Sequence, residues 1–249
     1  MIGEMEQKTN GRAFGPLELE LFWKISGSIV SGRYLKEILQ LIVTMTAETL
    51  GSKICSILLL DEKTQELAVA ATQSISPDYL KKPNIKVSES VSGRAVTQMH
   101  PVTVPDVTRE KAFRFPDIAR REKIVSLLCV PMMVGKRVIG VINVYTTEPR
   151  TFSESEIKLL QAVANQAAVA IENTKLRDEA IAARDAVETG KLMNRAKAAL
   201  MKQMGLTEDA AHQLLLKSSR NNRKTLREVA EAVLLTFGSN NNGKHPKLH

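Results

Sequence analysis

The stretch VSLLCVPMMVGKRVIGVINVY, residues 125–145, has two β-rich apolar arms joined by Gly135-Lys136. A two-residue loop with glycine at its first position is typical of a type II′ turn, whose twist suits paired antiparallel strands. The stretch therefore predicts a β-hairpin. Further back, KICSILLLDEKTQELAVAAT at residues 53–72 reads as strand, polar turn and strand, so it predicts a second antiparallel pair.

Helical patterns surround these strands. Residues 17–50 follow the 3.6-residue period, and Gly51 can end that helix. The stretch SVSGRAVTQMHPVTV, residues 90–104, predicts a short helix that begins near a glycine and leads into a strand. Residues 106–122 are polar and carry Phe113 and Phe115 among charges.

A long helix is predicted to begin near residue 154, because Ser153 and Glu156 have the spacing of a capping box. Its apolar positions form two series, which a five-residue step separates: Ile157, Leu160, Ala164, Ala167, Ile171, and then Leu176, Ala180, Ala183, Val187. The first series suits packing on its own domain. Residues 176–188 are too polar and alanine-rich for deep burial, so they indicate a coiled-coil-like helix that pairs with another chain.

Three short helices are expected after that segment. In KLMNRAKAALMKQMG, residues 191–205, one apolar stripe is expected to contain Met193, Ala196, Leu200, Met201 and Met204. Gly205 can stop this helix, and Thr207 can cap the next. Thr225 and Glu228 form another capping box, which predicts a third helix. So small a helical core is marginal alone, and support from the long helix is expected.

Composition excludes several classes of protein. The chain has 249 residues and a net charge of +8, of which +3 falls within residues 185–237. No apolar run approaches the ~18 residues of a membrane span, and the polar N-terminus lacks a secretory signal. Cys55 and Cys129 lie in apolar runs, which favours buried, reduced thiols and a cytoplasmic location. No Cys/His spacing suits a metal, and no spacing suits a catalytic triad or dyad, so we expect no enzyme.

A basic run, KSSRNNRKTLREVA at residues 217–230, suggests an anionic partner. Lys217 and Arg220 fall in the last turn of the second short helix, where the helix dipole favours cations. The dipole does not explain Arg223, Lys224 and Arg227, which are expected at the start of the third helix. A helix N-terminus with nearby cations is suited to binding phosphate.

The sequence resembles two families, one after the other along the chain. Residues 20–175 resemble a GAF domain through SVSGRAVTQMHPVTVPDV and through LLCVPMMVGKRVIGVINVYTTEPRTFSESEIKLLQAVANQAAVAIENTKL. Residues 187–236 resemble the ANTAR family of transcription antitermination regulators through AKAALM, LTEDAAHQLL and SSRNNRKTLREVAEAV. ANTAR domains usually read Ala-Lys-Gly where this chain has Ala198 in place of the glycine. Alanine is the better helix former, so the fold is not threatened, but details of RNA binding could differ.

The resemblance implies a fold and a division of the chain. A GAF domain is an α+β fold with a central six-stranded antiparallel sheet flanked by helices, and an ANTAR domain is an all-α three-helix bundle. We therefore expect the domain organisation to consist of a disordered N-terminal segment (1–16), a GAF domain (17–175), a helical linker (176–188), an ANTAR domain (189–237) and a disordered tail (238–249).

The resemblance also implies a function. The ANTAR domain is expected to bind RNA hairpins in nascent transcripts and so prevent terminator formation, and the GAF domain is expected to sense a small ligand or a partner. ANTAR proteins usually act as dimers, which the long helix suits. A DNA-binding transcription factor with a helix-turn-helix-like C-terminal unit is the alternative, because three helices with a basic turn can resemble that motif.

Candidate site residues follow from both patterns. The expected RNA contacts are Arg195, Lys197, Lys202, Asn222, Arg223, Lys224 and Arg227, with Lys217 and Arg220 as additional contacts. The expected GAF pocket residues are Phe113, Arg114, Phe115, Asn143 and Tyr145. Neither cysteine is marked for a covalent chromophore. The constellation that binds cyclic nucleotides in some GAF domains is echoed only faintly, because Val144 stands where lysine belongs.

Overall fold

The structure is a computed structural model that describes residues 15–30, 34–74 and 76–237. It divides into two compact units, with the boundary between Thr174 and Lys175. The disorder expected at 1–16 and 238–249 lies outside the described residues except at Gly15 and Pro16, and Pro16 begins helix α1 rather than belonging to a disordered segment.

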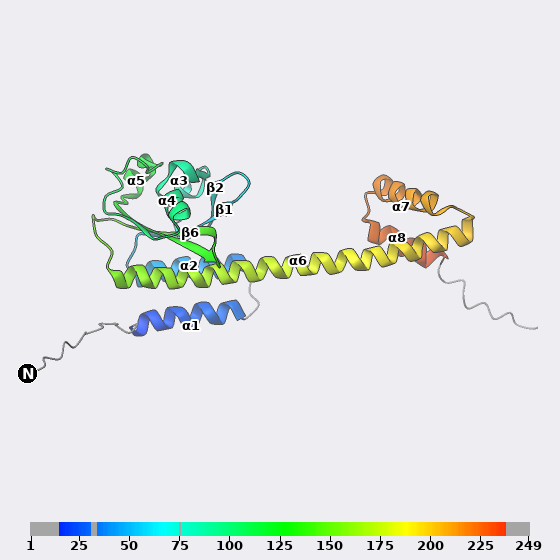
Figure 1. Cartoon of the computed structure of the whole chain (residues 1–249), viewed down its shortest axis with the longest axis horizontal. Coiled ribbons are helices and arrows are strands. Elements are labelled where there is room, and N and C mark those ends of the chain that lie inside the picture. Colours follow the sequence, from blue (N-terminus) through cyan, green and yellow to red (C-terminus); the bar gives the residue numbers. More distant parts are fainter. Residues whose placement is uncertain (1–14, 31–33, 75, 238–249) are drawn as a thin grey trace, which may run out of the picture. The chain divides into compact units, whose positions relative to one another are not determined.

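The first unit contains a six-stranded sheet, short helices and the beginning of the longest helix (Figure 1). The strands are β1 Ile54–Asp61, β2 Glu66–Thr72, β3 Ile85–Lys86, β4 Val102–Val104, β5 Ser126–Val134 and β6 Arg137–Thr146. The helices of the two units together are α1 Pro16–Val30, α2 Leu35–Thr49, α3 Pro77–Leu80, the 3₁₀ turn η1 Val87–Glu89, α4 Val91–Gln98, α5 Pro116–Glu122, α6 Glu154–Met204, α7 Glu208–Asn222 and α8 Leu226–Phe237.

The sheet has the order β3-β2-β1-β6-β5-β4, and every neighbouring pair is antiparallel. Both predicted hairpins are confirmed. Val134 pairs with Arg137 across the two-residue loop, in which Gly135 has a φ of 60°. A left-handed glycine at this position is what a primed hairpin turn requires. The expected α+β fold with a central six-stranded antiparallel sheet is therefore confirmed.

Apolar side chains cover both faces of this sheet, because successive residues of a strand point to opposite sides. In β6, Ile142 and Val144 pack under α1, α2 and the first part of α6. The alternate residues Val141 and Tyr145 pack on the other side, with α3, α4 and α5. Figure 1 shows these helices in two groups on either side of the sheet. Asn143 lies two residues before Tyr145 in β6, so its side chain points to the same side of the sheet as Tyr145.

Two helix predictions in this unit need correction. The single helix expected over residues 17–50 is two helices, α1 and α2, and α2 begins after Tyr34, which has an extended backbone. Each helix buries its own apolar stripe in one core, and one straight helix could not do both. The polar segment 106–122 also contains the short helix α5, which begins at Pro116, where proline is favoured.

Helix α6 begins where its capping box predicts. The Ser153 N–H donates to Glu156 Oε2 (2.8 Å), and the Glu156 N–H donates to Ser153 Oγ (3.3 Å). The helix then continues for 51 residues without a break. Its last turns are the helix that the sequence predicted separately at 191–205, so one helix serves both units. Gly190 lies inside it, and Gly205 ends it with a φ of 63°.

The C-terminal unit has a small core between α6, α7 and α8. Its buried members are Met193, Ala196, Leu200, Ala211, Leu215, Val229 and Ala230. The expected stripe on the first helix is only partly right, because Met201 and Met204 are exposed. Both Thr207 and the Thr225–Glu228 capping box are confirmed as helix starts, with Thr207 Oγ1 accepting from the Ala210 N–H.

Two glycines differ sharply in what a methyl group would meet. A Cβ on Gly140 would lie 2.2 Å from the Leu58 carbonyl oxygen across the β1–β6 ladder, whereas a Cβ on Gly190 would meet nothing within 4 Å. We expect Gly140→Ala to destabilise the first unit by about 1–3 kcal/mol through overpacking. Gly190→Ala, the matched control, should stabilise the C-terminal unit by up to about 1 kcal/mol.

Denaturant unfolding measures both effects. Far-UV circular dichroism follows the loss of the helices of both units. A Gly140→Ala protein as stable as wild type would contradict the close approach of β1 and β6.

Candidate functional site

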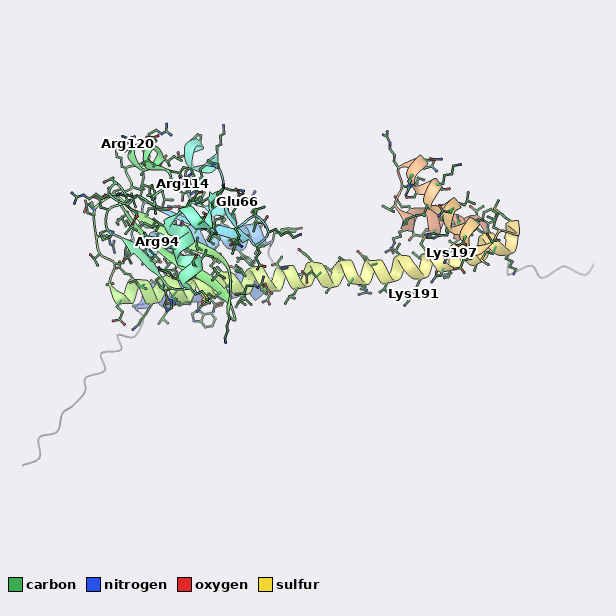
Figure 2. All side chains as sticks on the ribbon, turned by 45° about the horizontal axis from the view of Figure 1, so that its top comes forward. Glu66, Arg94, Arg114, Arg120, Lys191 and Lys197 are labelled. Atoms are coloured by element: carbon green, nitrogen blue, oxygen red, sulfur yellow. The ribbon has the colours of Figure 1, made fainter. Side chains whose placement is uncertain are left out.

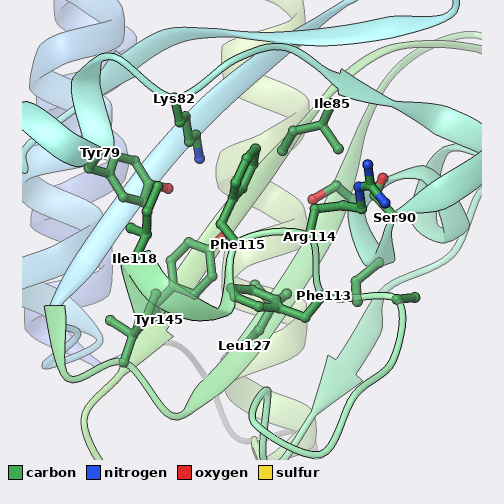
Figure 3. Close-up of a pocket in the computed structure, with 14 residues that line it drawn as sticks. Tyr79, Lys82, Ile85, Ser90, Phe113, Arg114, Phe115, Ile118, Leu127 and Tyr145 are labelled. Carbon is green, nitrogen blue, oxygen red and sulfur yellow. The ribbon is translucent and has the colours of Figure 1, made fainter. Parts of the chain in front are cut away.

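A cavity of about 20 Å³ lies on the α3–α5 side of the sheet (Figure 3). Its walls are Tyr79, Lys82, Ile85, Ser90, Val91, Ser92, Ala112, Phe113, Arg114, Phe115, Ile118, Ile124, Leu127 and Tyr145. Four of the five residues predicted from the sequence are therefore brought together here: Phe113, Arg114, Phe115 and Tyr145. The aromatic rings meet edge to face, with Phe113 6.5 Å and Tyr79 6.3 Å from Tyr145 between ring centroids.

Asn143, the fifth predicted residue, does not line the cavity. It is fully buried beneath the floor, where its side-chain amide donates to Ser92 Oγ (3.0 Å) and to the Tyr145 hydroxyl (3.2 Å). The hydroxyls of Tyr79 and Ser56 lie 2.8 Å apart and continue this chain of polar groups. Asn143 thus positions Tyr145 at the cavity floor.

The floor of the cavity is uncharged. Burial raises the pKa of Tyr145 well above its usual range, and the charge of Tyr79 and a hydrogen bond with that residue raise it further. Burial also raises the pKa of both thiols, Cys55 and Cys129, so they stay protonated at neutral pH. Because the buried hydroxyls and the amide satisfy one another, the inner end of the cavity suits an apolar group.

The mouth of the cavity is basic. The Lys82 ammonium lies 3.8 Å from the centroid of the Tyr79 ring and 6.0 Å from that of Phe115. Lys82 is half-buried and forms no ion pair with any residue that the structure describes. Arg114, on the opposite side of Phe115, pairs with Glu89 at 3.3 Å.

Sequence reasoning missed several residues of this site, including Tyr79, Lys82, Ser90 and Ser92. Tyr79 and Lys82 lie between Pro77 and Pro83, and these two prolines were a sequence signal for an ordered segment between strands. The faint echo of a cyclic-nucleotide constellation does not assemble at the cavity. Phe152 packs on the other side of the sheet, and Glu156 caps α6.

Two of the cations expected at the RNA interface are engaged within the C-terminal unit. Lys197 is mostly buried and donates to Glu208 Oε1 (2.7 Å), which ties α6 to α7. Arg227 pairs with Glu231 (3.1 Å) and with Glu188 (3.5 Å), which ties α8 to α6. The helix dipole left Arg227 without a structural explanation, and these two carboxylates supply one, Glu188 from another helix.

Helix α7 also ends later in the basic run than expected from the sequence. Helix α7 extends through Asn222, and Arg223 ends it in the left-handed conformation, with a φ of 52°. The Lys224 N–H closes this helix end on the Ser219 carbonyl (3.1 Å). Arg223 thus belongs to the end of α7 rather than to the start of α8. The Asn222 side chain donates to the Ser218 carbonyl (2.9 Å), so it stabilises its own helix.

Six of the predicted cations form no ion pair with any described residue: Arg195, Lys202, Lys217, Arg220, Arg223 and Lys224. Four of them lie within eight residues at the end of α7. The other two lie on α6, on the side opposite Lys197, because a helix turns about 100° per residue. Figure 2 shows Lys197 and Lys191 on different sides of the helix. Arg195, Lys197 and Lys202 therefore do not share one surface.

An open groove of about 550 Å³ runs beside Lys197 in the same unit. It is lined by Asp185, Ala186, Thr189, Gly190, Met193, Asn194, Lys197, His212 and Leu226. Because the groove is wide and open to solvent, it resembles a surface for part of a larger partner more than a closed small-molecule site.

The described residues hold neither a membrane span nor a metal cluster. No helix among them is long and apolar enough to cross a membrane. No group of three or more His, Cys, Asp or Glu side chains in these ranges could hold a metal ion.

An aromatic cavity on a six-stranded antiparallel sheet, with a basic three-helix unit after it, defines a regulator with a sensory and a binding module. The chain belongs to the GAF domain family, whose model matches residues 33–172, and an ANTAR domain follows at residues 182–234. ANTAR domains are RNA-binding antitermination domains, so the tandem architecture is that of a signal-transducing regulator.

Two similar proteins match about three fifths of the chain. A methyl sulfide methyltransferase-associated sensor of Methanosarcina acetivorans is 27% identical over 60% of this chain, and a phosphoenolpyruvate-dependent phosphotransferase system protein of Escherichia coli is 22% identical over 61%. The matches span only 16% and 20% of those relatives.

Solved structures agree on the fold. The GAF domain of an Acinetobacter phosphoenolpyruvate-protein phosphotransferase superposes with a TM-score of 0.57 at 23% identity, over 67% of this chain and 99% of that one. That of the Coxiella burnetii enzyme gives 0.59 at 20% identity, over 65% and 96%. Sequence identities this low support a shared fold but give no information about a ligand.

The tie between α6 and α7 can be tested by titration. The hydrogen bond from Lys197, together with its charge, holds the pKa of Glu208 below its usual range. Lys197→Met should raise that pKa, as measured by NMR of the Glu208 carboxyl carbon, while Lys191→Met, on the other side of α6, should leave it unchanged. Equal Glu208 titration in both variants would contradict the contact.

The same contact has a pH-dependent stability. Folding lowers the pKa of Glu208. The contact therefore stabilises the folded state fully when the pH is above the pKa that Glu208 has in the unfolded chain, and this stabilisation is lost as the pH falls through the pKa that Glu208 has in the folded protein. The difference in melting temperature between wild type and Lys197→Met should therefore shrink in acid.

Proposed function

We propose that this protein is a signal-responsive transcription antitermination regulator. Its ANTAR domain binds RNA hairpins in nascent transcripts and prevents terminator formation, while the GAF domain responds to a small effector or a partner. The role needs no catalysis, and its RNA targets place the protein in the cytoplasm. The observation that carries the proposal is the group of cations at the end of α7 that pair with no described carboxylate, within a unit that matches the ANTAR family.

The main RNA contact in this proposal is a surface made of Lys217, Arg220, Arg223 and Lys224, which we call the turn surface. Lys217 and Arg220 are three residues apart, so they share the solvent face of α7. Because no described carboxylate pairs with these side chains, they can meet phosphates without first breaking an ion pair. Arg223 is set at the helix end by a left-handed backbone that non-glycine residues seldom adopt.

Arg195 and Lys202 form a second surface with Lys191 on the outer face of α6, within about 40° of one another around the helix axis. Lys197, Asn222 and Arg227 have structural partners, so in this proposal they hold the bundle together and contribute less to RNA affinity. The proposal thus narrows the RNA contacts expected from the sequence to the cations without partners.

Charge removal at the turn surface tests the proposal. Arg223→Ala with Lys224→Ala should weaken binding to an RNA hairpin and reduce the salt slope of log K by about two, roughly one for each phosphate that is no longer neutralised. Folding should be unaffected, because neither side chain has an ion-pair partner among the described residues. Lys53→Ala with Lys111→Ala removes the same charge from the first unit and should leave affinity nearly unchanged.

Filter binding or fluorescence anisotropy at several salt concentrations measures these slopes. Competition between hairpin RNA and duplex DNA at one ionic strength separates the two polyanions. Preferred binding of duplex DNA would replace the antitermination role with the DNA-binding alternative. An unchanged RNA affinity in the double variant, with normal folding, would remove the turn surface from the proposal.

We further propose that the protein is a homodimer through α6. Within residues 175–191 the helix has no buried side chain, yet Leu176 and Val187 are 53% and 58% exposed. Together with Ala180 and Ala183 they follow a 4, 3, 4 spacing, which is the seam of a coiled coil. Such a seam gains stability by burying its apolar side chains against a second copy.

Charge placed in this seam should dissociate the dimer. Leu176→Glu with Val187→Glu should convert it to a monomer in light scattering, because two buried carboxylates per chain would lack partners. Ile181→Glu is the matched control, since Ile181 is 50% exposed but lies off the seam by about 100° or more. A wild-type monomer at micromolar concentration would refute the dimer.

A further inference from the structure

The cavity on the α3–α5 side of the sheet is too small for the ligand that a sensor needs. Its volume is about 20 Å³, close to the room that one water molecule occupies. A benzene-sized guest needs a cavity of about 150 Å³. The half-buried rings of Phe113 and Phe115 occupy the difference, so any ligand must displace one of them.

Phe115 is the side chain placed to move. A second cavity, of about 180 Å³, lies on its other side and is lined by Glu66, Pro83, Asn84, Ile85, Lys86, Glu89, Arg114 and Phe115. Ile85, Arg114 and Phe115 belong to both cavities, so they form the partition between them. Rotation of Phe115 would join an apolar inner space to a polar outer one.

The partition is held by weak contacts. Arg114 pairs with Glu89 at 3.3 Å, and about half of each side chain is exposed. Exposed ion pairs of this kind contribute little to stability, so opening the partition costs little at this point. The segment before it is tied more firmly, because Glu110 accepts from Arg94 (2.7 Å) and from the Ala112 N–H (3.0 Å). Any opening of the partition would therefore involve Arg114 and Phe115 before the Glu110 segment.

Charge around the inner cavity selects the sign of the ligand. Two cations, Lys82 and Arg114, line it, and no carboxylate does so among the residues that the structure describes. Glu89 already neutralises Arg114, whereas among the described residues Lys82 has the faces of Tyr79 and Phe115 beside it and no carboxylate partner. Figure 3 shows the Lys82 side chain directed toward Phe115. An acid group next to the displaced Phe115 would be the missing partner of this ammonium.

We propose that the GAF cavity binds a small aromatic monocarboxylate, whose ring takes the place of the Phe115 ring in the cavity that Phe113 and Tyr145 also line, and whose acid group pairs with Lys82. The neutral, internally satisfied floor of Tyr145, Asn143 and Ser92 excludes charge from the inner end and accepts the ring. This inference rests on the proposed sensory function and specifies the class of its signal.

Three probes with the same ring and different charge test the class: benzoate, benzyl alcohol and benzylamine. Calorimetry or ligand-observed NMR on the full chain should rank benzoate first and benzylamine last. Phe115→Ala, which opens the partition in advance, should bind benzoate more tightly than wild type. If this variant does not fold, Phe115→Leu replaces it and should also bind benzoate more tightly than wild type, by a smaller factor.

Lys82→Met removes the charge and keeps the length of the side chain. It should weaken benzoate binding about tenfold, the worth of one charge-assisted contact, while leaving benzyl alcohol unchanged. Lys81→Met is the matched control, because Lys81 is exposed and does not line the cavity. It should bind benzoate like wild type.

Several results would overturn the proposal: no binding of any probe to the folded Phe115 variant, benzylamine binding as tightly as benzoate, or equal effects of Lys82→Met and Lys81→Met. Hairpin RNA binding is measured on the same preparations. Retained RNA binding with failed probe binding overturns only the ligand class, whereas failure of wild type to bind hairpin RNA overturns the proposed function.

Discussion

One helix has to satisfy two hydrophobic cores, and the rest of the structure depends on that constraint. The N-terminal part of α6 buries Leu160, Ala164 and Ala167 under the sheet, while its last turns bury Ala196 and Leu200 against α7 and α8. Residues 175–191 of the helix have no buried side chain, so packing within the chain contributes little to its stability there. A second chain along the Leu176–Val187 seam would supply that packing, which links oligomeric state to the continuity of the helix.

The sensory cavity depends on a different constraint, the two-residue alternation of the sheet. Because Val141, Asn143 and Tyr145 share one face of β6, a polar amide lies beneath a tyrosine at the cavity floor. The opposite face packs on α6, with Ile142 and Val144 in the same core as Ala167. One strand thus contacts both the cavity and the helix that leaves the domain. If Phe115 moved to admit a ligand, any change in β6 would be felt in this core, since close-packed interiors transmit strain.

Sequence reasoning succeeded where the signals were local. The turn at Gly135, the stops at Gly51 and Gly205, and the capping boxes at Ser153 and Thr225 each depend on neighbours within a few residues, and each is confirmed. It failed where partners come from elsewhere in the chain.

Lys197 and Arg227 looked free because Glu208 and Glu188 are brought to them by other helices. The left-handed end of α7 at Arg223 had no glycine to mark it, and Lys82 became a cavity residue only through the packing of α3 on the sheet.

Continuity of α6 past Gly190 is the most consequential of these points. A distance between spin labels at Arg177→Cys and Lys191→Cys, in labelled protein diluted with unlabelled protein, tests it most directly. An unbroken helix predicts one narrow distribution near about 21 Å, from fourteen residues at 1.5 Å each. A broad distribution, or a clearly shorter distance, would show that α6 breaks between the cores and would contradict the account.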